Sequence, residues 1–259
     1  MIEVINIKKS FGPKVVIDGV SSVMECGKMN LVIGASGSGK TVFLKCMVGL
    51  MEVEQGQILY EGKDFTAMND KERKELRMQI GMLFQGSALF DSLNVEKNVM
   101  FPLDMFTNNT SAEKLKRVNE VLERVNLKDA NKKFPAEISG GMKKRVALAR
   151  AIVLNPKFLF CDEPNSGLDP KTSLVIDKLI KEITTDFNIT TIINTHDMNT
   201  VMEYGDSIMF LHQGKKNWQG NKNDIFYSND ENLNDFIFAS DFLKDTKKMK
   251  IMMDQKSYK

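Results

Sequence analysis

Residues 34–41, GASGSGKT, have the composition of a loop that binds phosphate groups. They match the pattern G-x-x-x-x-G-K-[ST] at every fixed position, after a short apolar run and before a helical pattern. The glycines allow backbone N–H groups to close around a β-phosphate, the lysine reaches the β- and γ-phosphates, and the threonine hydroxyl ligates Mg²⁺. The residues expected to hold the nucleotide are Gly34, Ser36, Gly37, Ser38, Gly39, Lys40 and Thr41.

Two neighbouring carboxylates end a second apolar run, FLFCDE at residues 158–163. Asp162, at the end of a buried strand, can hold Mg²⁺, usually through water. Glu163, one residue farther out, can polarise a water molecule for in-line attack on a γ-phosphate. Two acids at a strand end are common, and it is their combination with the phosphate loop that predicts hydrolysis of a nucleoside triphosphate.

A second pattern suited to phosphate lies in ISGGMKKRVALAR, residues 138–150. A serine and two glycines open a helix there, and backbone N–H groups at a helix N-terminus favour an anion. Lys143, Lys144 and Arg145 could add positive potential, although a solvated helix face explains these cations equally well. The chain therefore carries two phosphate-binding patterns.

The elements that must position these residues alternate between strand and helix. Short apolar runs at 158–163, 190–196 and 207–212 are typical of strands buried on both faces of a sheet, and 173–183 has helical spacing. This alternation predicts a mostly parallel, doubly wound α/β sheet. The segment from about 87 to 155 is helical in pattern and indicates a helical subdomain inserted into that core.

Composition narrows the classes of partner. A net charge of +2 is too small for a nucleic-acid footprint, so we expect no nucleic-acid partner. No apolar run approaches the ~18 residues of a membrane span. The N-terminus alternates like a strand and lacks a signal-peptide core, and Cys26, Cys46 and Cys161 have no metal-ligand spacing. We expect a cytosolic protein that needs a partner to act at a membrane.

With these motifs combined, residues 2–225 resemble the ATP-binding cassette (ABC) ATPases. The resemblance implies a RecA-like P-loop NTPase core with an inserted helical subdomain, an ATPase domain over 1–225 and a tail over 226–259. In this family two cassettes close head to tail, and each ATP lies between the phosphate loop of one copy and the signature motif of the other. SGGM at 139–142 is similar to that signature.

The resemblance assigns further roles residue by residue. Ser139, Gly140 and Gly141 would cap the γ-phosphate held by the second copy of a homodimer. Four other residues stand in matching motifs. Phe11 would stack on adenine, and Gln85 would contact Mg²⁺ and the attacking water. Asp169 would lie near the opposite nucleotide, and His196 would touch the γ-phosphate. Outside its motif, such an aromatic is more often a core residue and a lone histidine a surface residue.

Two departures from the family pattern indicate a subfamily. Met142 stands where most cassettes have glutamine, and Asn165 stands where threonine or serine is usual. SGGM together with residues 83–103 is most similar to the ATPases of Mla-type (MCE-associated) phospholipid transport systems. That similarity implies an integral permease of the MlaE type, an MCE-domain lipid-binding protein, and a peripheral location on the cytoplasmic face of the inner (plasma) membrane. The alternative is an amino-acid or lipoprotein transport ATPase.

Two other classes that share the cassette fold are disfavoured. DNA-maintenance ATPases insert a long coiled coil between the glutamine and the signature, whereas Gln85 and Ser139 are close in sequence, with no heptads between them. Translation-associated cassettes carry two phosphate loops on one chain, and this chain has one.

The tail sequence NDENLNDFIFASDFLKD predicts one helix that begins near residues 229–231 and ends near Lys244 to Lys247. Its apolar stripe comprises Leu233, Phe236, Ile237 and Leu243, broken by Ser240. Three interpretations stay open. The helix packs on its own core, it docks on the sister cassette or a small accessory subunit, or KDTKKMK at 244–250 binds a membrane surface.

Overall fold

The structure is a computed structural model that describes residues 1–257 and contains two compact units. The helical unit comprises residues 67–194 with 26–28 and Met1. The strand-rich unit comprises residues 2–25, 29–66 and the chain from Thr195 onward. In the described part of the chain no helix is both long and apolar enough to cross a membrane.

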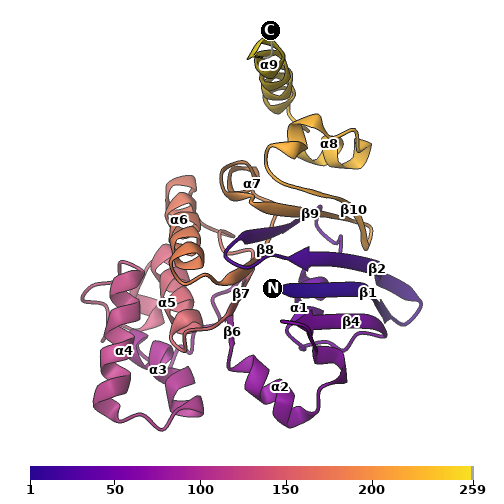
Figure 1. Cartoon of the computed structure of the whole chain (residues 1–259). Coiled ribbons are helices and arrows are strands. Elements are labelled where there is room, and N and C mark those ends of the chain that lie inside the picture. The colour runs from indigo at the N-terminus through magenta and orange to yellow at the C-terminus, as the bar shows by residue number, and fades with distance from the viewer. Residues whose placement is uncertain (258–259) are drawn as a thin grey trace. The chain divides into compact units, whose positions relative to one another are not determined.

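One sheet of the strand-rich unit is antiparallel. Its strands are β1 (Ile2–Phe11), β2 (Lys14–Met24), β4 (Gln55–Tyr60) and β5 (Lys63–Asp64), in the order β2-β1-β4-β5. Ile2 and Val4 of β1 are buried at alternate positions, which puts one face of the strand on the core. Ile7 is buried as well, although it is three residues past Val4, because the strand has a register shift between these two residues. Figure 1 shows β2, β1 and β4 side by side.

The remaining strands of this unit are β3 (Met29–Ile33), β9 (Ser207–His212) and β10 (Lys215–Gly220). β3 runs parallel to β9, which pairs antiparallel with β10. Every residue of β3 is buried, as expected for a strand covered on both faces. The helices of the unit are α1 (Lys40–Met47), α7 (Met198–Tyr204), α8 (Glu231–Ile237) and α9 (Asp241–Ser257), with short 3₁₀ helices η1 (Phe65–Ala67) and η3 (Asp224–Tyr227).

The strands of the helical unit are parallel. β7 (Phe158–Asp162) lies between β6 (Ile80–Leu83) and β8 (Thr190–Thr195). All residues of β7 and β8 are buried, which explains why both appear in the sequence as continuous apolar runs. The connection from β7 to β8 is α6 (Pro170–Asp186), and β6 is preceded by α2 (Asp70–Arg77). The predicted parallel α/β architecture is confirmed.

Residues 87–155, all of which the structure describes, contain helices and no strand. The elements are α3 (Val95–Phe106), α4 (Ser111–Arg124), the 3₁₀ helix η2 (Pro135–Glu137) and α5 (Gly140–Ile152). α3, α4 and α5 pack against one another (Figure 1). This helical cluster follows β6 and precedes β7, as predicted for an insertion into the α/β core.

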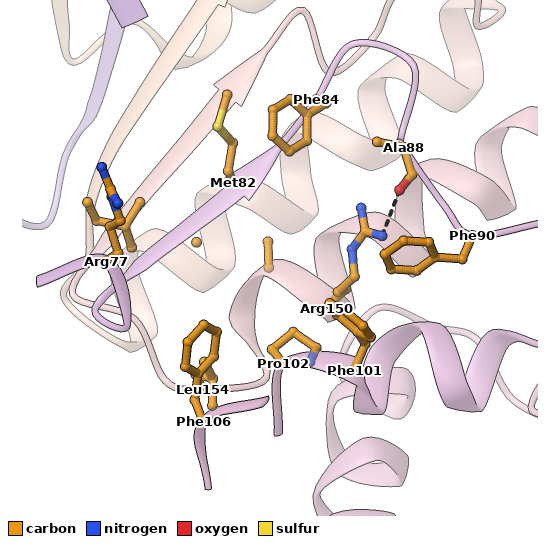
Figure 2. A pocket seen from close by; sticks show the side chains of 13 residues that line it. Arg77, Met82, Phe84, Ala88, Phe90, Phe101, Pro102, Phe106, Arg150 and Leu154 are labelled. Carbon is orange, nitrogen blue, oxygen red and sulfur yellow. Dashed lines mark hydrogen bonds between the residues drawn. The ribbon is translucent and has the colours of Figure 1, made fainter. Parts of the chain in front are cut away.

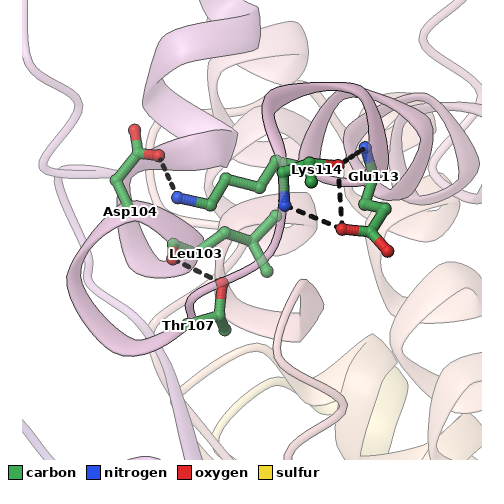
Figure 3. A network of polar contacts seen from close by, with 6 residues as sticks. Leu103, Asp104, Thr107, Glu113 and Lys114 are labelled. Atoms are coloured by element: carbon green, nitrogen blue, oxygen red, sulfur yellow. Dashed lines mark hydrogen bonds and ion pairs between the residues drawn. The ribbon is translucent and has the colours of Figure 1, made fainter.

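Polar contacts hold the hairpin between α3 and α4 (Figure 3). The Lys114 amine lies 2.9 Å from a carboxylate oxygen of Asp104, and the lysine side chain is only 14% exposed. A capping box closes the N-terminus of α4, in which the Thr110 N–H donates to Glu113 and the Glu113 N–H donates to the Thr110 hydroxyl. These contacts satisfy N–H groups that a helix start leaves unpaired.

The tail forms two helices, so the prediction of one continuous helix is wrong. α8 ends at Ile237, and α9 begins at Asp241 and continues well past Lys247. Ser240 starts the second helix, because its hydroxyl accepts the Leu243 N–H at 3.3 Å. A serine that caps a new helix competes with continuation of the old one.

α8 packs on the core of its own unit. Leu233 and Ile237 are buried, and the Phe236 ring stacks on Phe210 of β9 with centroids 5.5 Å apart. Phe238 is also buried, although it lies off the predicted apolar stripe, whereas Phe242 at the start of α9 is 78% exposed. For α8 the packing agrees with the first of the three interpretations of the tail.

Truncating the chain after Ser228 is expected to lower the free energy of unfolding by several kcal/mol. Each large apolar side chain of α8 that loses its burial contributes roughly 1.5–3 kcal/mol. The matched control ends the chain after Ser240, which keeps α8 and removes only α9. We expect this shorter deletion to shift the urea midpoint much less. Equal midpoints for the full chain and the Ser228 truncation would contradict packing of α8 on the core.

Candidate functional site

The phosphate loop of the strand-rich unit joins β3 to α1 and packs tightly against neighbouring strands. A Cβ atom at Gly34 would lie 2.2 Å from the Leu211 carbonyl oxygen, and one at Gly39 would lie 2.9 Å from the Val16 carbonyl oxygen. At Gly37, where φ is +78°, a Cβ atom would have no atom of a more distant described residue within 4 Å. Glycine is therefore required on the packed side, while the other side of the loop faces open space.

Lys40 lies folded over this loop. Its amine donates to the carbonyl oxygens of Gly34 at 2.7 Å and Ala35 at 3.1 Å, and the residue is 6% exposed. The Ser38 hydroxyl is buried and has no hydrogen-bond partner in the described part of the chain. Ser36 and Thr41 are exposed. Exposed hydroxyls, a buried hydroxyl and a lysine amine in one loop fit a bound phosphate chain.

Phe11 and His196 belong to the same unit. Phe11 ends β1, is 47% exposed, and has the Lys9 amine 5.5 Å from its ring centroid. An exposed aromatic ring offers a face on which a base can stack. His196 is exposed and follows β8 directly, before Asp197 caps α7 through the Asn199 N–H.

In the helical unit, the two carboxylates stand at the end of β7. Asp162 is buried, and its Oδ1 accepts the Asn194 side-chain amide at 3.0 Å. Glu163 has a φ of +47°, a left-handed conformation that is strained for a residue with a side chain, and its N–H donates to the Asn194 carbonyl. Asn194 thus orients both acids. Sequence reasoning missed this role, although the residue stands in the NTHD motif.

The structure brings Gln85 and Glu163 into direct contact. The Gln85 side-chain amide donates to Glu163 Oε2 at 3.1 Å and reaches the Ser166 hydroxyl at 3.4 Å. Gln85 lies just beyond β6 and Glu163 just beyond the adjacent parallel strand β7. Because carboxyl ends of parallel strands meet at one edge of a sheet, residues distant in sequence converge there.

The signature residues open α5. Ser139 is the N-cap, and its hydroxyl accepts the Met142 N–H at 3.3 Å. Ser139 and Gly140 are exposed, while Gly141 is buried where a Cβ would lie 2.5 Å from a methyl group of Thr172 on α6. Gly141 therefore permits close packing of α5 on α6. The N-cap Ser139 and the first residue of α5, Gly140, stay exposed to solvent.

Asp169 has a local structural role. It caps α6, because its carboxylate accepts the Thr172 N–H at 3.0 Å and the Thr172 hydroxyl at 2.5 Å. The hydrogen bonds from Thr172 lower the pKa of Asp169. The neighbouring departure from the family pattern is also explained, since Asn165 is buried and donates to Asp177 of α6 at 2.8 Å.

Lys144 does not lie on a solvated helix face, so that interpretation is wrong for this residue. It is 4% exposed, and its amine donates to the main-chain carbonyl oxygens of Gln85 and Glu163. Burial lowers the pKa of Lys144. Its helical spacing to Ala147, Leu148 and Ala151, all buried, was the sequence signal that could have revealed its position.

No group of three or more histidine, cysteine or acidic residues suited to a metal occurs in the part of the chain that the structure describes. Mg²⁺ does not require one, since it is usually bound through one or two carboxylates together with substrate phosphates and water. Gln85 and Asp162 in the helical unit and Thr41 in the strand-rich unit each offer an oxygen atom, the type of donor that Mg²⁺ prefers.

A family model and two similar proteins of known name point to the same family. The ABC transporter family model matches residues 17–166. The probable ribonucleotide transport ATP-binding protein mkl of Mycobacterium leprae is 42% identical over 81% of this chain and 60% of its own length. The methionine import ATP-binding protein MetN of Campylobacter jejuni is 37% identical over 94% of this chain and 77% of its own length. The chain thus spans about three fifths of the length of the mycobacterial relative.

Solved structures that resemble this chain are also ABC transporter proteins. The dimeric structure of MJ0796, a bacterial ABC transporter cassette, superposes with a TM-score of 0.79 at 28% identity, covering 86% of this chain and 99% of that one. A second dimeric structure of MJ0796 is a post-hydrolysis state bound to ADP and Pi. cbiO1 from Clostridium perfringens, part of the ABC transporter complex cbiONQ, gives a TM-score of 0.81 at 30% identity, covering 88% of this chain and 90% of that one. The chain therefore belongs to the ABC transporter family, and its fold is that of the family's ATPase cassettes.

Proposed function

We propose that this chain is the ATP-hydrolysing subunit of a membrane transporter. The observation that carries the proposal is the hydrogen bond from the Gln85 amide to the Glu163 carboxylate, immediately after Asp162. It places a residue that can orient water against a residue that can accept its proton. A phosphate loop in the same chain supplies the binding site for the group that this water attacks.

The roles proposed for the individual side chains are those that the resemblance to the ABC ATPases implies. Lys40 binds the β- and γ-phosphates, Phe11 stacks on adenine, and His196 contacts the γ-phosphate. Glu163 accepts a proton from the attacking water. Thr41, Gln85 and Asp162 would hold Mg²⁺, and this ion would supply positive charge to the phosphate oxygens.

Each ATP is shared between two copies of the chain in a homodimer. The exposed N-terminus of α5, with Ser139 and Gly140 uncovered, is open to a γ-phosphate held by another copy. Asp169 is exposed as well. In the proposed dimer it would stand near the opposite nucleotide. The dimeric state of the MJ0796 cassette supports this arrangement.

A hollow of about 430 Å³ in the helical unit is the proposed contact with the permease (Figure 2). Its lining is mostly aromatic and aliphatic, and comprises Arg77, Ile80, Gly81, Met82, Phe84, Ala88, Phe90, Phe101, Pro102, Phe106, Arg150, Ala151 and Leu154. An apolar segment of a partner would bury these side chains. The hollow includes residues on both sides of Gln85, so an occupant would contact the segment that carries this glutamine.

The proposed cargo is phospholipid, in a Mla-type system with a MlaE-type permease and an MCE-domain protein. The similarity of residues 83–103 and of the SGGM motif to such ATPases supports it, and the chain would act peripherally on the cytoplasmic face of the inner membrane. A second candidate is amino-acid import, favoured by the MetN relative, whose match covers 94% of this chain. A small accessory subunit would be a further partner, with exposed residues of α9 as its site.

Copurification from membranes tests the transporter and its cargo together. A tagged chain is expected to retain an integral permease of the MlaE type, identified by mass spectrometry, together with an MCE-domain protein. Phe106→Asp, which puts a charge at the rim of the hollow, should lose the permease but keep the ATPase rate of the isolated chain. Phe187→Asp is the matched control, because Phe187 is an exposed phenylalanine outside the hollow.

Two results would change these conclusions. Recovery of an amino-acid permease would replace phospholipid by the second candidate. Recovery of the same permease by Phe106→Asp at the level of Phe187→Asp would show that the hollow is not the contact.

A further inference from the structure

Lys144 connects the signature helix to the two residues proposed to orient and deprotonate water. Its amine donates to the main-chain carbonyl of Gln85 and, at 3.4 Å, to that of Glu163. These residues follow two different strands, and Lys144 comes from a third element, α5. The lysine therefore contacts the main chains of Gln85 and Glu163, whose side chains are joined by the 3.1 Å hydrogen bond from the Gln85 amide to Glu163 Oε2.

The segments held in this way are strained. Glu163 has a φ of +47°, and Ser87 and Ala88, just after Gln85, have φ values of +64° and +47°. Such conformations persist only where the surrounding structure holds them. Lys144 supplies contacts of this kind at the carbonyl groups of Gln85 and Glu163.

A second cation of α5 holds the far end of the same turn. The Arg150 guanidinium donates to the carbonyl oxygens of Ser87 and Ala88, each at 2.7 Å (Figure 2 shows the contact with Ala88). Both ends of the turn from Gln85 to Ala88 are thus attached to one helix through main-chain carbonyls. Lys144 in addition joins this turn to the end of the strand that carries the carboxylates.

Burial of the Lys144 ammonium group is unfavourable in itself. Removing an ammonium group from water costs free energy that an apolar side chain of similar length would not lose. The lysine offsets this cost through charge-assisted hydrogen bonds to the two carbonyl groups. The carboxylates of Asp162 and Glu163 and the Cys161 thiol lie near enough to act on it electrostatically.

We propose that Lys144 is a positioning residue for ATP hydrolysis, which keeps the Gln85 amide against the Glu163 carboxylate by tying both main chains to the signature helix. This inference rests on the proposed role of Glu163 as the base. Lys144 does not touch the reacting atoms. Its loss should slow the chemical step while leaving nucleotide binding unchanged, because the phosphate-loop residues Gly34 to Thr41 keep their side chains and neither carbonyl group held by Lys144 belongs to that loop.

Lys144→Met tests this directly, since methionine keeps an unbranched stem and removes the donors. We expect kcat for ATP hydrolysis to fall on the order of tenfold to a hundredfold, the scale of a small misplacement of catalytic groups, with KM for ATP unchanged. Lys144→Arg restores donors and should recover part of the rate. Lys114→Met is the matched control, because it also removes a largely buried lysine, at the α3–α4 hairpin, and should keep the wild-type kcat.

A double-mutant cycle with Glu163→Gln shows whether Lys144 acts through Glu163. Single-turnover rates are measured for both single variants and for the double variant. We expect Lys144→Met to change the residual rate less than about twofold once Glu163 is replaced. The double variant should still form the ATP-bound closed dimer, which confirms an intact signature. If Lys144→Met does not fold, Lys144→Gln, whose shorter amide cannot span both carbonyls, takes its place with the same expectations.

Three results would overturn the inference about Lys144 and leave the role of Glu163 standing. They are an unchanged kcat in Lys144→Met, an equal loss in the presence and absence of Glu163, and failure of the double variant to close around ATP. Near-normal turnover of Glu163→Gln alone would instead overturn the proposed role of Glu163, and the inference about Lys144 with it.

Discussion

Glu163→Gln is expected to slow ATP hydrolysis by about 10²–10⁴, the usual effect of losing a positioned base. The amide has nearly the same shape as the carboxylate but cannot accept a proton from water. ATP and Mg²⁺ binding should remain, because Lys40, Thr41 and Asp162 are unchanged. Phosphate release measures the rate, and size-exclusion chromatography with ATP should show a closed dimer that accumulates.

The matched control for this variant is Glu113→Gln. Glu113 is a carboxylate of the same unit that caps α4, with no part in the proposed chemistry. The Glu113→Gln variant should hydrolyse ATP at the wild-type rate. Near-normal turnover in Glu163→Gln would remove Glu163 from its role as base.

A mixed dimer of a Lys40→Ala chain and a Ser139→Arg chain is expected to regain activity that each homodimer lacks. Lys40 belongs to the phosphate loop, and Ser139 lies at the exposed start of α5. If each ATP lies between the loop of one copy and the signature of the other, the mixed dimer has one site with both lesions and one with neither. ATPase rates of heterodimers purified through two different tags measure the effect.

A reciprocal heterodimer provides the control. One chain carries both Lys40→Ala and Ser139→Arg, and the other is wild type, so each shared site then contains one lesion. We expect this heterodimer to be inactive. Activity near half the wild-type value in this dimer, with no recovery in the first one, would mean that each site is complete within a single chain.

Much of the fold could be predicted because its signals are local. β7 and β8 are continuous apolar runs because both faces of these strands are covered, and the phosphate loop is recognisable because Gly34 and Gly39 have no room for a side chain. The break between α8 and α9 was missed for the opposite reason. A serine is compatible with a continued helix, so Ser240 gave no clear local signal of a break. In the structure it caps a new helix instead, and Phe236 of the preceding helix packs on Phe210 of β9.

The sequence by itself determined which residues can bind phosphate, hold Mg²⁺ or accept a proton, since these are properties of residue types at short spacings. Only the tertiary structure decided how Asn194 holds Asp162 and Glu163, and that Lys144 is buried against Gln85 whereas the adjacent Lys143 stays partly exposed. Adjacent lysines look alike in a sequence. Which one is buried depends on which helix face meets the ends of β6 and β7, and that is set by packing between segments far apart in the chain.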